Sequence, residues 1–200
     1  SFYDEFGTRW RRPLDGCYYD MVEFPLGSCT FEVLDRFKWP DPEDPGRVRG
    51  VKDELVRLRS ETDFALEAGL VGLWETAWFT VGLERWLLAL SEAPDFVEVL
   101  LDKTLDFLKR MHGAYLDVAG PYLDLVTLWD DYGAQSASLI SPTLWRKLVK
   151  PRLADLIALI RSKTNAYIGL HSCGSIFSLL DDLTEIGIQV INPVQVSAKH

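Results

Sequence analysis

Cysteine is scarce in this chain, which has only Cys17, Cys29 and Cys173 among its 200 residues. An odd number of cysteines in a chain of this length argues against a disulfide framework and favours a reducing compartment. We therefore expect a cytoplasmic protein. Histidine is equally rare, with three in the chain, and neither His112 nor His200 has sequence neighbours that indicate a role.

Long apolar runs are absent as well. No uninterrupted apolar stretch approaches the roughly 18 residues that a membrane span requires. The first ten residues alternate charged and aromatic side chains, which is unlike a signal peptide. The sequence therefore predicts neither a membrane protein nor a secreted one.

Positive charge is in short supply. The chain has 21 Lys and Arg against 30 Asp and Glu, a formal net charge of −9 at pH 7. Nucleic acid and anionic membrane surfaces are polyanions, so neither is expected as the main partner. A neutral or cationic small-molecule substrate suits an acidic protein better.

Hydrophobic residues make up 48% of the chain, which is enough to bury a core, and the length predicts one domain over residues 1–200. Residues 1–50 are rich in aromatic residues, Pro and Asp, and they end near a segment with several Pro at 39–46. This composition predicts an irregular arm and loop. Residues 62–200 are expected to form repeated βα units. Because the first residue is not Met, we expect a central fragment of a longer protein.

Apolar periodicity predicts alternating strands and helices after residue 50. A buried strand with its exit loop is expected within 64–74, and further strands over 123–129, 166–170 and 188–191. The expected helices cover 51–60, 83–90 and 95–119, a segment that opens at Ser141-Pro142 and is kinked or restarted at Pro151, and a segment from Ile176 that stops at Gly187.

Strands that alternate with helices, without hairpin signals, indicate parallel pairing through right-handed crossovers. Two architectures fit this pattern, a doubly wound sheet and a (β/α) barrel. The dinucleotide-binding pattern GxGxxG is absent, which argues against the first. The predicted fold class is α/β, a (β/α)8 TIM-type barrel. It would be incomplete in this chain, because such a barrel needs about 250 residues.

Polar side chains follow each predicted strand. Because active sites of parallel barrels lie at the carboxyl ends of the strands, we expect these side chains to lie close together. In chain order they are Glu75, then Asp130, Asp131 and Gln135, then His171 and Cys173, then Asn192 and Gln195.

His171 and Cys173 have the strongest chemical signal. The i, i+2 spacing places both side chains on one side of an extended segment, where they could reach one ion. Imidazole and thiolate are preferred zinc ligands, and a catalytic zinc takes three protein ligands and keeps one position open. The spacing alone equally fits a half-buried Cys and a His bonded to backbone carbonyls. Position at a strand end favours the metal.

The other candidates have weaker signals. Asp130 and Asp131 could hold substrate, orient a metal-bound His or act as a general base, and they could equally form an ordinary polar loop that caps a helix. Asn192 and Gln195 could orient a substrate through hydrogen bonds. The Trp and Tyr side chains could line an aromatic pocket, although most of them are more simply explained as core.

Five short motifs, taken in order, resemble a known family. They are Asp130-Asp131-Tyr132-Gly133-Ala134-Gln135, Leu139-Ile140-Ser141-Pro142, Lys150-Pro151-Arg152, His171-Ser172-Cys173-Gly174-Ser175 and Ile191-Asn192-Pro193-Val194-Gln195. The region 130–195 thus resembles the uroporphyrinogen decarboxylase superfamily, and weaker similarity extends back to about residue 39. The resemblance implies a (β/α) barrel that decarboxylates porphyrinogens or, in another branch, transfers methyl groups with a corrinoid.

The methyltransferase branch binds zinc through a His-x-Cys pair and a later Cys. The resemblance therefore implies that His171 and Cys173 are zinc ligands and that a third ligand follows His200. It also implies a corrinoid (cobalamin) as methyl carrier, on a partner protein, and a small thiol, methoxy or methylamine substrate. For the remaining roles, we expect Asp130 and Asp131 to be catalytic and four residues to bind substrate: Glu75, Gln135, Asn192 and Gln195.

Two alternatives stay open. Uroporphyrinogen decarboxylase, a carboxy-lyase of porphyrin and haem biosynthesis, needs no metal. Its substrate carries many carboxylates and requires a basic cleft, whereas the strand ends of this acidic chain supply Asp, Glu, His, Cys, Asn and Gln. The third possibility is a barrel without activity that binds a ligand or a corrinoid protein. A zinc-dependent methyltransferase is the favoured prediction.

Overall fold

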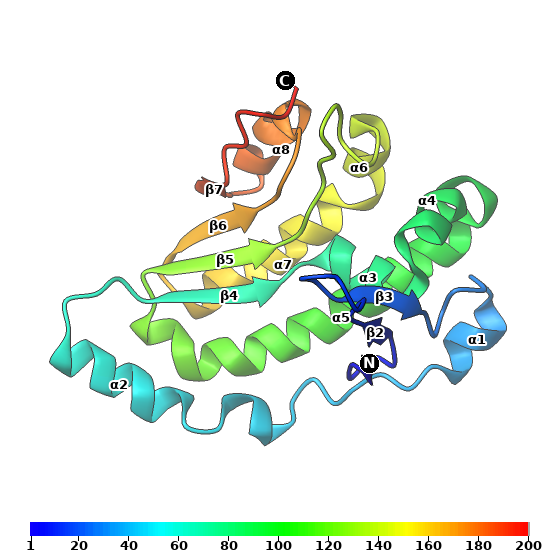
Figure 1. The fold of residues 1–200 in the computed structure, drawn as a ribbon. Helices are drawn as coiled ribbons and strands as arrows, with labels where there is room; N and C mark the ends of the chain where they lie inside the picture. The colour runs from blue at the N-terminus through cyan, green and yellow to red at the C-terminus, as the bar shows by residue number, and fades with distance from the viewer. Residues whose placement is uncertain (200) are drawn as a thin grey trace.

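A parallel sheet with the strand order β4-β5-β6-β7 forms the centre of the computed structural model, which describes residues 1–199 (Figure 1). His200 lies outside the described residues. The four strands are β4 (Glu67–Val71), β5 (Leu125–Trp129), β6 (Tyr167–His171) and β7 (Val190–Asn192). Val71 pairs with Trp129, Trp129 with His171, and His171 with Asn192. The carboxyl ends of the four strands therefore lie side by side.

Helices connect successive strands, as the predicted βα repeats require. The β4 to β5 connection contains α3 (Leu73–Val81), α4 (Leu83–Glu92), α5 (Pro94–Ala119) and the short 3-10 helix η2 (Gly120–Tyr122). The later connections contain α6 (Pro142–Leu148) and α7 (Lys150–Lys163), then η3 (Phe177–Leu179) and α8 (Leu180–Glu185). The long helices α5 and α7 pack against each other (Figure 1).

The two faces of the sheet differ in burial. One face is apolar and buried, with contributions from Leu70, Leu128 and Leu170. On the other face Val71, Trp129 and Tyr167 are exposed. Within residues 1–199 the sheet stays open and does not close into a barrel. The predicted α/β class, with an incomplete barrel, is therefore confirmed.

The prediction for residues 1–50 is wrong in part. Three short antiparallel strands form there, β1 (Phe2–Tyr3), β2 (Arg9–Arg11) and β3 (Asp20–Glu23), followed by α1 (Phe31–Arg36) and η1 (Pro45–Val48). Cross-strand side-chain pairs hold this sheet: Tyr3 and Arg9 both donate hydrogen bonds to Glu23, and Phe2 stacks on Trp10. Such pairs stabilise strands too short to show an alternating pattern.

Helix α3 was not predicted: its first two residues were assigned to the exit loop of β4, and residues 75–81 were assigned to no element. Seven of its nine residues are buried, among them Trp74 and Trp78. A helix that is apolar all round has no amphipathic periodicity, so a pattern search cannot distinguish it from a buried strand. The consequence for the site is that Glu75 lies in the first turn of a helix.

The predicted helix start at Ser141 and the restart at Pro151 are confirmed. Ser141 Oγ accepts a hydrogen bond from the backbone N–H of Leu144 at 3.2 Å. Helix α6 ends at Leu148, and α7 starts at Lys150 with Pro151 in its first turn. Proline is tolerated there because the first N–H groups of a helix have no partner within the helix.

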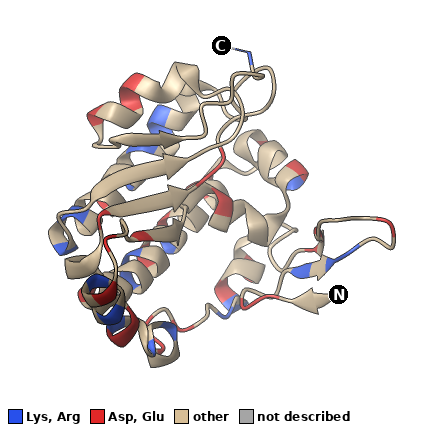
Figure 2. Cartoon of the chain, turned by 60° about the vertical axis from the view of Figure 1, so that its left-hand side comes forward, with Lys and Arg blue, Asp and Glu red and all other residues tan. Residues whose placement is uncertain are grey.

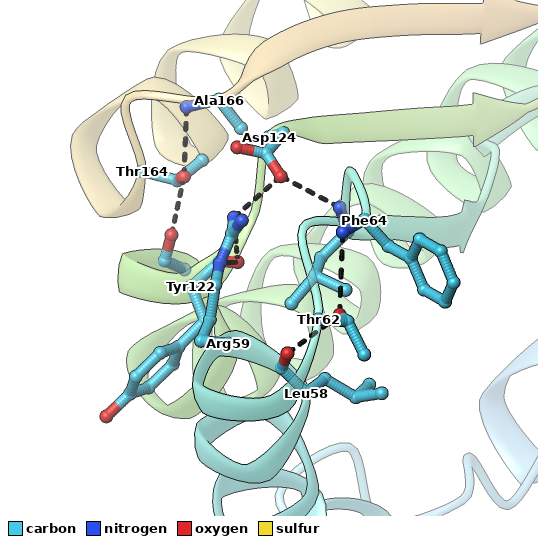
Figure 3. Close-up of polar contacts among 10 residues, drawn as sticks. Leu58, Arg59, Thr62, Phe64, Tyr122, Asp124, Thr164 and Ala166 are labelled. Carbon is cyan, nitrogen blue, oxygen red and sulfur yellow. Dashed lines mark hydrogen bonds and ion pairs between the residues drawn. The ribbon is translucent and has the colours of Figure 1, made fainter.

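Polar contacts fix the amino ends of the strands (Figure 3). Asp124, just before β5, accepts hydrogen bonds from the backbone N–H of Leu66 at 2.8 Å and from Arg59 at 2.6 Å. These hydrogen bonds lower the pKa of Asp124. Arg59 belongs to α2 (Val51–Glu61) and also donates to the carbonyl of Tyr122. Helix α2 is thereby tied to the end of the sheet opposite the candidate site.

Charged residues of both signs lie mainly on the helices and their connections (Figure 2). Many of them pair, as in the cluster where Arg146 and Lys150 contact Asp182 at 2.9 and 2.8 Å. No helix in the described part of the chain is both long and apolar enough to cross a membrane.

His112 in α5 is buried, and neither ring nitrogen has a hydrogen-bond partner among the described residues. Burial lowers the pKa of His112 to about 4. Between pH 6.5 and 4 the unfolded chain therefore binds a proton that the folded chain excludes, so folding stability falls as the pH falls through this window. At pH 5 we expect His112 to cost about 2 kcal/mol of unfolding free energy relative to pH 7.

The variant His112→Leu tests this expectation by urea unfolding at pH 7 and pH 5. The wild type should lose about 2 kcal/mol more than the variant between the two pH values. Groups such as Asp130 titrate in both proteins and cancel in the comparison. Equal losses in the two proteins would show that His112 does not titrate as proposed.

Candidate functional site

The candidate site lies at the carboxyl edge of the parallel sheet, where the predicted residues were expected. His171 is the last residue of β6, and its cross-strand neighbours are Trp129 at the end of β5 and Asn192 at the end of β7. The following loops carry Asp131 and Cys173. Strands in register end together, and this brings side chains from distant parts of the chain to one edge.

Three side chains form a group that could hold a metal ion. The ligand atoms of Asp131, His171 and Cys173 all lie within 4.8 Å of one another, and each of the three residues is half-buried. Cys173 Sγ is 3.5 Å from His171 Nε2. The sequence paired His171 with Cys173 correctly in space, but it did not distinguish Asp131 from its neighbour Asp130.

The loop contacts explain how Asp131 reaches the group. Its Oδ1 accepts a hydrogen bond from the backbone N–H of Cys173 at 2.7 Å. Gly133 lies against the Cys173 and Gly174 backbone, where a Cβ atom would come within 2.4 Å of the Cys173 carbonyl oxygen. Gly174 has a φ of +79°, a conformation that glycine adopts without strain. The two loops thus pack backbone against backbone.

His171 is held from two directions. Its Nδ1 lies 2.8 Å from Asn192 Oδ1, and because an amide oxygen only accepts, Nδ1 carries the proton. The Nε2 lone pair is then free to bind a metal. Trp129 stacks on the imidazole, with ring centroids 4.2 Å apart and planes 19° apart. No pattern in the sequence predicts this stacking, because it depends on the register of β5 against β6.

Gln195, expected to bind substrate, contacts the loop that carries Cys173, and Gln135, also expected to bind substrate, contacts Gln195. Gln195 Oε1 accepts a hydrogen bond from the backbone N–H of Gly174 at 2.7 Å, and Gln195 Nε2 donates to Gln135 Oε1 at 3.3 Å. These contacts support the loop. Asn192 likewise contacts His171, so two of the four residues expected to bind substrate directly support the candidate ligands, and Gln135 supports one of those two.

Asp130 points away from the group and is fully buried. It accepts hydrogen bonds from the backbone N–H groups of Trp74 and Glu75 at 3.1 and 2.7 Å, and from the Tyr132 hydroxyl. Asp130 therefore caps the amino end of α3 from another part of the chain. Burial raises the pKa of Asp130 to about 6, against the lowering effect of these hydrogen bonds. These contacts favour a structural role over the predicted catalytic one.

Negative charge dominates the surroundings of the group. Burial, Asp130 and Asp131 together raise the pKa of Glu75 to about 8, so Glu75 is mostly protonated at neutral pH. Burial raises the pKa of the Cys173 thiol, and Asp131 and Glu75 raise it further. A bound cation would relieve this accumulation of acidic groups.

A cavity of about 490 Å³ adjoins the group. Glu75 and Trp129 line it. Trp129 also stacks on His171, and Glu75 is close enough to Asp131 for that carboxylate to raise its pKa. The remaining walls come from the end of β4 and from α3, α5 and the segment 1–50. Sequence reasoning had not connected α5 or residues 1–50 with the site. These walls comprise Asp4, Glu5, Phe6, Arg47, Val71, Gly72, Thr76, Phe79 and Met111.

The parallel sheet and the polar residues at its carboxyl edge define a protein of the (β/α)-barrel class. The family model for uroporphyrinogen decarboxylase (URO-D) matches residues 22–193, and the chain therefore belongs to this family. The predicted resemblance is thus confirmed. No curated protein matches the chain.

Among solved structures, a methyltransferase from Methanosarcina mazei is similar, with a TM-score of 0.64 and 19% sequence identity. The alignment covers 94% of this chain and 52% of that chain. The likeness shows a common fold, and the present chain spans about half the length of that structure.

Proposed function

We propose that this chain belongs to a zinc-dependent enzyme that moves a methyl group between a corrinoid and a small thiol, methoxy or methylamine compound. The observation that supports the proposal is the grouping of Asp131, His171 and Cys173 ligand atoms within 4.8 Å of one another. A corrinoid on a partner protein would be the methyl carrier. The whole protein would be cytoplasmic.

The donor set fits zinc. Imidazole nitrogen, thiolate sulfur and carboxylate oxygen are its usual protein ligands, and three of them leave the fourth position open for substrate, as in catalytic sites. The third ligand was expected beyond His200. Asp131 now offers a third donor within the described residues, and we propose it as a ligand.

Bound zinc would deprotonate a thiol or polarise an ether oxygen. The residues of the chain would keep the ligands in position for this chemistry. Asn192 fixes the proton of His171 on Nδ1, and Trp129 fixes the plane of the ring. Gln195 supports the Cys173 loop through Gly174. Glu75 faces the adjoining cavity and is the candidate to contact substrate.

Uroporphyrinogen decarboxylation is the alternative, and the description of the matching family model favours it. Its substrate carries many carboxylates and would need several basic groups. In the cavity lining the basic side chain is Arg47, which already pairs with Glu5, and Asp4 and Glu75 are also present. The charge of the cavity therefore supports methyl transfer over decarboxylation.

Metal analysis and turnover of the full-length protein test the proposal. We expect about one zinc per chain after purification under reducing conditions. Methyl transfer between methylcobalamin and a small thiol should stop on chelation and return with added zinc. Protein that folds without binding zinc and decarboxylates uroporphyrinogen would establish the alternative, and zinc-free protein without either activity would support a binding barrel.

Asn192→Ala is expected to weaken zinc binding about 10- to 100-fold, because the imidazole loses the acceptor that fixes its orientation. Competition with a chromophoric chelator measures this affinity. Asn192→Asp keeps an acceptor oxygen and should retain most of the zinc affinity. Asn165→Ala is the control: it makes the same substitution at an exposed position outside the site and should leave zinc affinity unchanged. Unchanged zinc affinity in Asn192→Ala would exclude a positioning role for Asn192.

A further inference from the structure

We propose that Gly69 is a positioning residue of the candidate metal group. It leaves the space that holds the Trp129 indole, and the indole in turn stacks on His171. The effect on zinc rests on the proposed function, whereas the contact itself can be measured in metal-free protein.

Gly69 lies in the middle of β4, where a glycine requires an explanation. It pairs with Thr127, the central residue of β5. Its φ is not positive, so the backbone conformation does not require glycine. Glycine within a strand weakens the strand and often marks a position that another group approaches closely. The reason for glycine therefore lies in its surroundings.

The group that approaches Gly69 is the indole of Trp129. A Cβ atom at position 69 would lie 2.8 Å from Trp129 Nε1, 3.5 Å from Cδ1 and 3.7 Å from Cε2. Non-bonded heavy atoms prefer separations of about 3.5–4.0 Å, so the contact with Nε1 is too short to form. The three atoms are consecutive in the five-membered ring. The edge of this ring therefore occupies the space that a side chain at position 69 would need.

Trp129 reaches Gly69 diagonally from the neighbouring strand. In the register of β4 and β5, Trp129 pairs with Val71, two residues beyond Gly69, and such diagonal neighbours are within reach of aromatic side chains. One face of the indole stacks on His171, with ring centroids 4.2 Å apart and planes 19° apart. The indole is rigid, so the edge contact with Gly69 and the stacking on His171 together fix its orientation.

A side chain at position 69 would therefore disturb His171 without touching it. The indole would have to turn away from Gly69, and a turned ring no longer lies parallel to the imidazole. Asn192 would still accept a hydrogen bond from His171 Nδ1, now 2.8 Å long, but the plane of the imidazole would lose its second constraint. Gly69 does not line the cavity, whereas Trp129 does, so any effect on the cavity also comes through the indole.

Gly69→Ala tests the proposal in metal-free full-length protein with isotope-labelled histidine rings, studied by NMR at constant pH. The ring protons of His171, identified by their absence in His171→Gln, should resonate upfield in the wild type because they face the indole. The upfield shift should be lost in Gly69→Ala. Zinc affinity, measured by chelator competition, should fall about tenfold, the lower end of the loss for residues that orient a metal ligand. Wild-type His171 resonances in Gly69→Ala overturn the proposal.

Trp129→Leu shows whether Gly69 acts through the indole. This variant removes the ring that Gly69 accommodates, and it should lower zinc affinity about as much as Gly69→Ala does. Adding Gly69→Ala to it should cause no further loss, because the effects of two residues that act through one contact do not add. If Gly69→Ala alone does not fold, Trp129→Leu should restore folding. Additive losses, or failure to restore folding, contradict the proposal.

Gly169→Ala is the matched control. Gly169 pairs with Thr127 from the opposite side, in β6, and a Cβ there would lie nearest to Thr127, Leu125 and Val190 rather than to Trp129. This variant should keep the upfield shift of His171. A wild type that shows the upfield shift but binds no zinc would refute the proposed function and still support the positioning of His171 by Gly69.

Discussion

Cys173→Ala is expected to lower the affinity of the protein for zinc by more than about a hundredfold, since changes outside the ligand shell alone cost 10- to 100-fold. The variant keeps Asp131 and His171 but removes the sulfur that lies 3.5 Å from His171 Nε2. The imidazole of His171 and the carboxylate of Asp131 are two donors, and a catalytic zinc site takes three protein ligands. Zinc content and chelator competition measure the loss, and methyl transfer should disappear with it.

Cys17→Ala is the control, because Cys17 is an exposed free cysteine in the arm. It should bind zinc as the wild type does, and both variants should unfold at nearly the wild-type temperature in the absence of metal. Asp131→Asn in the same assay tests the third donor and should also weaken binding. Wild-type zinc affinity in Cys173→Ala would contradict the proposed ligand set.

Gly133→Ala is expected to destabilise the fold by about 3 kcal/mol, which lowers the melting temperature by roughly 10 °C. The added Cβ would lie 2.4 Å from the Cys173 carbonyl oxygen and 2.7 Å from Gly174 C and Ser175 N. All three atoms belong to the backbone, so the two loops must separate. Separation would also weaken the hydrogen bond from the N–H of Ser175 to the carbonyl of Ala134, now 2.8 Å long.

Gly113→Ala provides the matched comparison. Gly113 lies within α5, and a Cβ there would meet only Leu159 Cδ2 at 3.9 Å, an ordinary van der Waals contact. Alanine is the better helix former, so this variant should gain up to about 1 kcal/mol. Thermal unfolding of both variants separates close packing of the loops from a general effect of glycine replacement. Wild-type stability in Gly133→Ala would show that the loops are not in close contact.

The sequence alone determined where in the fold the candidate site lies, at the carboxyl edge of a parallel sheet. Short apolar runs that alternate with helices required a parallel sheet, and polar residues followed each run. Parallel strands in register end at one edge, so the polar residues that follow the strands had to come near one another. The motif order also carried the family resemblance, which the family model confirms.

The tertiary structure decided which way each side chain points. Asp130 and Asp131 are neighbours with the same chemistry, yet one caps α3 and the other contacts the Cys173 backbone. No local propensity distinguishes them, because the difference comes from partners 55 and 42 residues away in the chain. The same holds for Asn192, which was expected to bind substrate and whose side chain contacts His171.

Helix α3 and the arm were beyond sequence reasoning for a related reason. A helix buried on all sides has no apolar period, and the arm is held by cross-strand pairs such as Tyr3 with Glu23. Periodicity reports how a segment divides its surface between core and water. It therefore determined the strands and the edge where they end, whereas the direction of each side chain at that edge was fixed by contacts that form only when the chain folds.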